Sequence, residues 1–165
     1  YEGTSVALHA PTGTGKTLAY LLPLILRLEE ESWRTPRTGL RLLIMAPGAD
    51  LLLQICALAR ALVGVGRAQS VCVIRKDLDN TSVNGCIVVA TPRQIRDLLE
   101  EKMTAPVWRA ALAGVDMVVV DEADRLVAKG SKYWRKKRRL EGRIDPCITV
   151  LQTIAWETKR VGRKY

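Results

Sequence analysis

The stretch "APTGTGKT" (10–17) combines the residue types that bind phosphate. Gly13 and Gly15 allow backbone N–H groups to converge where a Cβ would obstruct them, and the helix that follows directs its positive dipole end to the same point. Lys16 then reaches phosphate oxygens, and the Thr17 hydroxyl takes a magnesium position. A glycine-rich turn that binds nothing would not need Lys and Thr together. The sequence therefore predicts a P-loop with nucleotide contacts from Ala10, Thr12, Gly13, Thr14, Gly15, Lys16 and Thr17.

The second candidate site is "VVVDEAD" (118–124), in which two carboxylates follow an apolar run. This run places Asp121 at the carboxyl end of a strand, where open α/β sheets bind their ligands. Asp121 is positioned to hold Mg²⁺, directly or through water, and Glu122 to orient and deprotonate an attacking water. Together with the P-loop, the segment predicts hydrolysis of a bound nucleotide. Lys16 and Glu122 are the candidate catalytic residues, Asp121 is a further nucleotide contact, and Thr17 and Asp121 are the candidate metal ligands.

Six short apolar runs predict strands, and they are continuous rather than alternating, as in strands covered on both faces. Segments with helical spacing lie between several of them, which indicates βαβ units. The predicted fold class is α/β, with a parallel sheet and helices on both faces, in a single domain over 1–165. The predicted strands cover 5–10, 40–46, 70–74, 86–90, 117–121 and 147–152.

Three segments carry the spacing and the end signals of helices. The first contains Pro23, which predicts a kink. The second has Asp50 as a predicted N-cap, and the third has Thr91 as the cap followed by Pro92 at the first helical position. The predicted helices cover 17–31, 50–63 and 91–102.

The formal net charge is +9, and a basic chain favours an anionic partner, most commonly nucleic acid. Basic residues gather within 129–143, a segment that does not fit the strand–helix alternation. Such a cluster neutralises several phosphates, and Tyr133 and Trp134 are placed to stack on bases. A solvated basic surface without a partner is the alternative, and the C-terminal end at 157–165 is also basic. The predicted RNA contacts of the segment are Lys132, Arg135, Lys136, Lys137, Arg138 and Arg139.

The cysteines and the hydropathy limit the cellular locations that we expect for the protein. Cys56, Cys72, Cys86 and Cys147 form no CxxC pair, which argues against zinc and predicts buried free thiols in a reducing compartment. No apolar run approaches the roughly 20 residues that span a bilayer, so we expect a soluble protein without a membrane partner. The chain begins at Tyr1, and nucleolar, cytosolic and mitochondrial locations all remain open.

Three motifs in order make the chain resemble the first RecA-like domain of a DEAD-box RNA helicase. They are "APTGTGKT", "IVVATP" (87–92) and "DEAD" (121–124), and the resemblance runs from about Glu2 to Ala155. It implies a RecA-like P-loop fold, ATP and Mg²⁺ as cofactors, and RNA-stimulated ATP hydrolysis that remodels RNA or ribonucleoprotein. Other assembly proteins are implied as further partners, and ribosome assembly is the suspected process.

The motifs through which the family contacts RNA depart from its pattern. The family's "PTREL" appears here as "PGADL" (47–51), with Gly48 and Ala49 in place of Thr and Arg. Its "TPGR" appears as "TPRQ", which puts Arg93 at the glycine position. The resemblance implies that Thr91 and Arg93 lie at the RNA.

The family's coupling motif "SAT" aligns best with "TIA" (153–155). In this alignment Thr153 keeps a hydroxyl contact to Asp124, and Ala155 loses the final hydroxyl. The adenine-reading segment and the second RecA-like domain of the family would lie outside this chain. Without the arginine fingers of that second domain, hydrolysis loses roughly 10³ to 10⁵ in rate.

Two functions remain open at this point. Intact Lys16, Thr17, Asp121 and Glu122 favour an ATP-dependent RNA helicase or RNA-dependent ATPase. The altered RNA and coupling motifs favour a catalytically weak or inactive helicase-like structural factor of an RNA–protein assembly. A generic P-loop kinase or AAA-type ATPase explains neither "DEAD" nor the "VVATP" before it.

Overall fold

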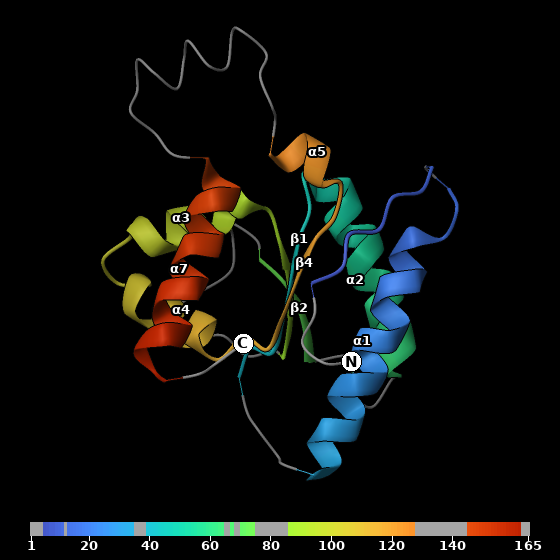
Figure 1. Cartoon of the computed structure of the whole chain (residues 1–165), viewed down its shortest axis with the longest axis horizontal. Coiled ribbons are helices and arrows are strands. Elements are labelled where there is room, and N and C mark those ends of the chain that lie inside the picture. The colour runs from blue at the N-terminus through green and yellow to red at the C-terminus, as the bar shows by residue number, and fades with distance from the viewer. Residues whose placement is uncertain are drawn as a thin grey trace, which may run out of the picture.

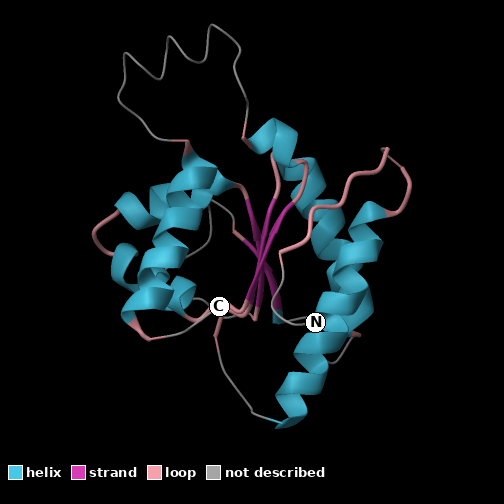
Figure 2. Cartoon of the chain, viewed as in Figure 1, coloured by secondary structure: helices cyan, strands magenta, loops and turns pink. Residues whose placement is uncertain are grey.

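The computed structural model describes residues 5–11, 13–34, 39–64, 67, 70–74, 86–127 and 145–162. They form three layers, with a sheet between two groups of helices (Figures 1 and 2). In chain order the elements are α1 (Lys16–Arg34), β1 (Leu42–Met45), α2 (Ala49–Val63), β2 (Val71–Val73), β3 (Ile87–Ala90), α3 (Pro92–Glu100), α4 (Ala105–Ala113), β4 (Met117–Val120), α5 (Ala123–Leu126) and α7 (Pro146–Arg160).

The sheet has four strands in the order β2-β3-β1-β4, and every neighbouring pair is parallel. Met45 at the end of β1 is level with Ala90 of β3 on one side and with Val120 of β4 on the other. The α/β class with a parallel sheet is thus confirmed, and three strands end together at one edge of the sheet.

The strands are apolar throughout because both faces of the sheet are covered. Along β1, Leu43 and Met45 enter one hydrophobic cluster, and Leu42 and Ile44 enter the other, as the alternation of side chains along a strand requires. Helices α3, α4 and α7 lie on the first face, and α1 and α2 lie on the second (Figure 1). The two faces therefore have separate cores.

The strand predicted at 147–152 is wrong, because these residues belong to helix α7. The Asp145 side chain accepts a hydrogen bond from the Cys147 N–H at 2.9 Å, and Pro146 occupies the first helical position. Val150 and Ile154 are then buried, with Cys147, in the core that α3 and α4 share. An Asp-Pro helix start and apolar spacing of three and four residues outweighed the β-branched run.

The strand predicted at 5–10 is also wrong. Within the described ranges these residues pair with no strand, and Val6 and Leu8 are 79% and 56% exposed. A strand is stabilised by its neighbour rather than by its own residues. The sheet ends at β4 in this part of the chain, and the other apolar run expected to extend it, 147–152, is helical.

The helix predictions hold, with different ends. Helix α1 continues past Pro23 to Arg34. The predicted cap Asp50 lies inside the first turn of α2, and Gly48 is the N-cap, so the Asp50 carboxylate acts on the helix dipole instead. Helix α4 was not predicted, and its buried Trp108 and Leu112 pack in the same core as α7.

None of the helices in the described ranges has both the length and the apolar character needed to cross a membrane. The four cysteines carry thiols and not disulfides, as predicted; Cys56 and Cys147 are buried, and Cys72 and Cys86 are partly exposed. Burial raises the pKa of the thiols of Cys56, Cys72 and Cys147 above the usual value. Buried thiols of this kind react slowly at neutral pH.

The raised thiol pKa values predict that the protein loses stability in alkali. A thiol whose pKa is raised by folding contributes stability that is fully present below its unfolded pKa, about 8.5, and is lost as pH rises through the folded value. We expect the free energy of unfolding in urea to fall from about pH 8.5 upward. A variant with Ala at Cys56, Cys72 and Cys147 should show a weaker fall, and equal slopes for the two proteins would contradict the prediction.

Candidate functional site

The carboxyl edge of the sheet brings residues of several predicted motifs together. The Ala46 N–H donates to the Ala90 carbonyl at 3.1 Å, and the Asp121 N–H donates to the Met45 carbonyl at 2.9 Å. These bonds continue the ladder for one step beyond each strand. Thr91 follows β3 and Asp121 follows β4, the two strands that flank β1. Both residues therefore lie at the same level of the sheet, where ligands of open α/β sheets bind.

The glycine-rich turn has backbone angles that favour glycine at two positions. Gly13 and Gly15 have φ angles of 79° and 83°. A Cβ placed on either residue would meet no atom within 4 Å, so the backbone conformation rather than crowding requires glycine. Helix α1 begins directly afterwards at Lys16, and its N-terminal N–H groups lie beside the turn. The turn and the helix start therefore provide the donors of an anion site.

The Lys16 side chain bonds back to the start of the glycine-rich segment. Its Nζ donates to the carbonyls of Ala10 at 2.5 Å and Pro11 at 2.7 Å. The Thr14 hydroxyl also donates to the Pro11 carbonyl, at 2.8 Å. A phosphate oxygen is charged and is therefore a stronger acceptor for the ammonium group than a carbonyl. The Lys16 ammonium group thus lies at the loop already, and a phosphate bound there would be a stronger acceptor than the two carbonyls.

Asp121 is the buried carboxylate of the site. It is 9% exposed, and its Oδ1 accepts from the Glu122 N–H at 2.9 Å. Its Oδ2 accepts from the Tyr20 hydroxyl at 2.9 Å, and the Thr17 side chain lies beside that same hydroxyl. Thr17 and Asp121 therefore bring a hydroxyl and a carboxylate oxygen close together, and these are oxygen donors of the kind that Mg²⁺ prefers.

Tyr20 is a site residue that the sequence interpretation missed. Burial, and next the charge of Asp121, raise the pKa of Tyr20 far above its usual value, so the hydroxyl keeps its proton and remains a donor. The available signal was position, because Tyr20 follows Lys16 by four residues and so shares its face of a helix. Nothing in the local sequence indicated the partner, which lies 101 residues away.

Glu122 has a backbone conformation that is rare for its residue type. Its φ and ψ are 48° and 50°, and within the described part of the chain it is the one residue other than glycine with a positive φ. Such a conformation costs of order 1 to 3 kcal/mol, and residues that keep it are enriched at active sites and switch regions. The carboxylate forms an ion pair with Arg125, one turn later on α5.

The predicted coupling pair is not joined in this structure. Asp124 is exposed on α5. Thr153 lies on α7, and its hydroxyl donates to the Thr149 carbonyl at 2.9 Å rather than to Asp124. The contact expected between the two residues required a strand at 147–152, and the helix places Thr153 in a different layer.

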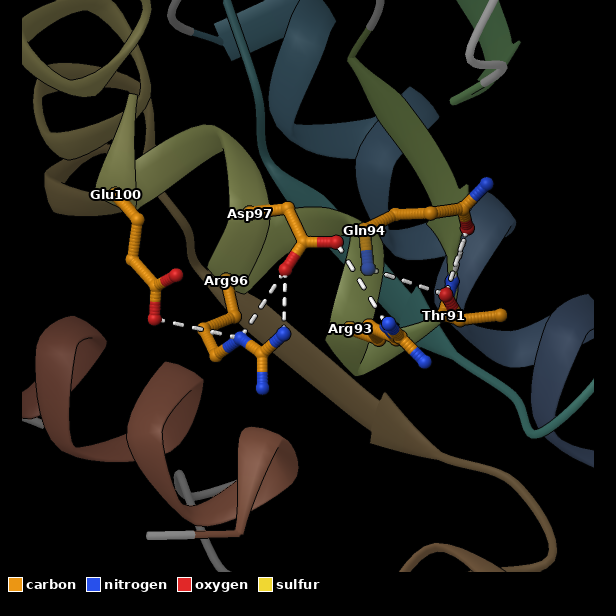
Figure 3. A network of polar contacts seen from close by, with 6 residues as sticks. All are labelled: Thr91, Arg93, Gln94, Arg96, Asp97 and Glu100. Carbon is orange, nitrogen blue, oxygen red and sulfur yellow. Dashed lines mark hydrogen bonds and ion pairs between the residues drawn. The ribbon is translucent and has the colours of Figure 1, made fainter. Parts of the chain in front are cut away.

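Thr91 caps α3, as predicted, and does so together with a residue that the prediction did not consider (Figure 3). The Thr91 N–H donates to Gln94 Oε1 at 2.8 Å, and the Gln94 N–H donates to Thr91 Oγ1 at 3.2 Å. This is a capping box. The Gln94 Nε2 also donates to the Ile74 carbonyl at 2.9 Å, just beyond β2. Gln94 therefore joins the start of α3 to the end of a neighbouring strand.

Arg93 is the exposed cation at the start of α3. Its side chain is 79% exposed, and its Nε is 3.8 Å from Asp97 Oδ2 (Figure 3). Arg96 takes the closer position beside Asp97, at 2.5 Å, and also pairs with Glu100 at 3.4 Å. Arg93 can therefore turn toward an anionic partner at little cost, since exposed ion pairs contribute little.

We expect Gln94→Ala to lower the free energy of unfolding by about 1 to 3 kcal/mol, because it removes the capping box and leaves the Ile74 carbonyl without this donor. Urea denaturation measures the change. Arg93→Ala, next to it on the same turn, should cost less than about 0.5 kcal/mol. Equal losses in the two variants would contradict a structural role for Gln94.

Several predicted site residues lie outside the described residues. They are Thr12 of the P-loop and the basic residues Lys132, Arg135, Lys136, Lys137, Arg138 and Arg139.

Comparison with known proteins assigns a family to this arrangement. The family described as "DEAD/DEAH box helicase" matches residues 1–155. The chain is 36% identical to "DEAD-box ATP-dependent RNA helicase 25" of Oryza sativa subsp. japonica, over 78% of this chain and 23% of that protein. It is 35% identical to "ATP-dependent RNA helicase DBP3" of Eremothecium gossypii, over 93% of this chain and 28% of that protein.

The fold agrees with the sequence matches. The crystal structure of the yeast DEAD-box splicing factor Prp28 superposes with a TM-score of 0.61 and 26% identity, over 90% of this chain and 32% of that one. The chain thus spans about a quarter to a third of the length of these relatives. The matched residues include both the glycine-rich turn and the "DEAD" segment, and the chain belongs to the DEAD/DEAH box helicase family.

Proposed function

We propose that this chain is the ATP-binding domain of an RNA-dependent ATPase that remodels RNA or ribonucleoprotein. The observation that supports it most is the meeting of the two nucleotide motifs. Tyr20, on the helix that begins with Lys16, donates to Asp121 at the end of β4 at 2.9 Å. The relatives' names describe ATP-dependent RNA helicases, and the chain covers 23% and 28% of two of them, so the activity of the whole protein is part of the proposal.

In the proposed mechanism, the P-loop holds the triphosphate and the carboxylates act on it from β4. The N–H groups around Gly13 and Gly15 and the Lys16 ammonium bind phosphate oxygens. Thr17 and Asp121 would hold Mg²⁺, which would neutralise charge on the phosphates. Glu122 accepts a proton from the attacking water on its carboxylate.

We place RNA along the same edge of the sheet, at the start of α3. Arg93 is the exposed cation there, and Thr91 precedes it. The basic residues between 132 and 139 are the second proposed contact, because a cluster of this density binds phosphates. Ribosome or other ribonucleoprotein assembly in a reducing intracellular compartment, with other assembly proteins as partners, is the process that we propose.

Two observations favour a second candidate function, a catalytically weak or inactive assembly factor. Gln94 stands where the family pattern has the Arg of "TPGR", and its side chain is used by the capping box and the Ile74 carbonyl. Thr153, proposed as a coupling residue from the "SAT" alignment, is bonded within α7. Residues at two motif positions are thus engaged in internal contacts.

Steady-state ATP hydrolysis by the full-length protein, with and without RNA, separates the two functions. Turnover that RNA stimulates supports the enzyme. ATP binding without turnover supports the assembly factor. A protein that binds no ATP contradicts the enzyme and also any role of a nucleotide in the assembly factor.

The RNA contact of the basic segment has a separate test. Replacing the six basic residues at 132 and 135–139 with Gln should weaken RNA binding and lower the slope of log affinity against log salt. On single-stranded RNA the slope should fall by about 0.7 for each phosphate that the segment neutralises. An unchanged slope would remove the segment from the RNA site.

A further inference from the structure

The Tyr20–Asp121 hydrogen bond has a special position in this fold. In many α/β sheets, a strand before the glycine-rich turn ties that turn to the sheet. Here residues 5–10 pair with no strand of the described part of the chain. The ladder bonds of the sheet therefore do not set the distance between Lys16 and Asp121. The bond from Tyr20, 2.9 Å long, links the two motifs directly.

Tyr20 is well placed to fix the carboxylate. Its ring packs against the hydrophobic cluster that includes residues of α1 and α2, and this packing restricts the position of the hydroxyl. The two bonds to Asp121 fall on different oxygens, Oδ2 from Tyr20 and Oδ1 from the Glu122 N–H. A carboxylate accepts about four hydrogen bonds or ligands. The two bonds hold the group in one orientation and leave acceptor positions for a metal or for metal-bound water.

We propose that Tyr20 is a positioning residue for the metal-binding carboxylate: its hydroxyl sets the orientation in which Asp121 receives the Mg²⁺ of MgATP. The proposal rests on the proposed ATP-binding function. Tyr20 and Lys16 share a face of α1, so the residue that orients Asp121 lies on the same helix as the phosphate-binding lysine. Groups that orient a metal ligand in this way typically change metal affinity by 10- to 100-fold.

Tyr20→Phe tests this role, since it removes the hydroxyl and keeps the ring. A fluorescent ATP analogue is titrated into the full-length protein at a series of MgCl₂ concentrations and in EDTA. We expect the Mg²⁺ concentration that gives half of the full effect on affinity to rise about 10-fold. Affinity in EDTA should stay at the wild-type value, because the P-loop is intact.

Thr149→Val is the matched control. Its hydroxyl makes a comparable bond, to the Asp145 carbonyl at 3.1 Å on α7, and its removal should leave the Mg²⁺ dependence unchanged. A second variant tests the partner: in Asp121→Asn protein, Tyr20→Phe should have no further effect on the Mg²⁺ dependence.

Four outcomes would overturn the proposal. An unchanged Mg²⁺ dependence in Tyr20→Phe would do so, as would an equal loss of affinity in EDTA, which assigns Tyr20 to the loop rather than to the carboxylate. The third outcome is a Tyr20→Phe protein that is already unfolded in thermal denaturation without nucleotide, which would mean that Tyr20 has a purely structural role. A wild-type protein that binds no ATP would contradict the proposed function together with the inference, whereas the first three leave that function intact.

Discussion

Glu122→Gln is expected to lower the rate of ATP hydrolysis by roughly 10² to 10⁴, while ATP affinity stays at the wild-type value. Proton transfer to a positioned base contributes a factor of that size, and an amide does not accept the proton. The substitution keeps the side-chain volume. The strain of the left-handed backbone, at φ 48°, is the same for Glu and Gln. Single-turnover hydrolysis in the presence of RNA separates the chemical step from product release.

Glu100→Gln is the matched control for this variant. Glu100 is also a helix carboxylate paired with an arginine, Arg96 at 3.4 Å, but it lies at the last residue of α3, away from the carboxyl edge of the sheet. Its turnover should equal that of the wild type. A Glu122→Gln protein with wild-type turnover would mean that Glu122 is not the base, and the strained turn would then need another explanation.

Lys16→Ala is expected to weaken MgATP binding by about 10- to 100-fold, the equivalent of losing a charged hydrogen bond worth about 1.5 to 3 kcal/mol. The ammonium group already lies at the loop, between the carbonyls of Ala10 and Pro11, so binding needs only an exchange of acceptors. Calorimetric titration with a non-hydrolysable ATP analogue measures the loss.

Lys102→Ala is the control for charge alone. Lys102 is exposed in the connection between α3 and α4, at the end of α3 that points away from the site. The variant carries the same change in net charge and should bind MgATP with wild-type affinity. If both variants bound MgATP equally weakly, a general electrostatic effect rather than a P-loop contact would be responsible.

The altered motifs have different meanings once their side chains are placed. Gln94 departs from the family pattern, yet it closes a capping box and bonds to the end of β2. Arg93, one residue earlier, is exposed. A cation at the start of α3 is therefore present, one residue before the position of the family's Arg. The case of Thr153 differs, because the segment that was predicted as a strand is part of helix α7.

The range of the interactions that place a residue decides whether its structure can be predicted from the sequence. Short-range signals were sufficient for the glycine-rich turn, for the strands that became β1, β2, β3 and β4, and for the Thr91 cap with Pro92. In each of these cases the residues that form the signal are also the residues whose structure it predicts, or are within a few positions of them. The family could be identified for the same reason, because its motifs are contiguous.

Tertiary structure decided the rest. The run at 5–10 has the composition of a strand and has no partner in the described sheet, and the run at 147–152 has the composition of a strand and packs as a helix against α3 and α4. Tyr20 and Asp121 are 101 residues apart, and only the packing of α1 beside the sheet brings the hydroxyl to the carboxylate. The sequence by itself determined the family motifs and the parallel α/β class, and it predicts which groups bind phosphate and carry the chemistry. The fold determined which of these groups meet, because a hydrogen bond or a strand pairing depends on a partner that local composition does not encode.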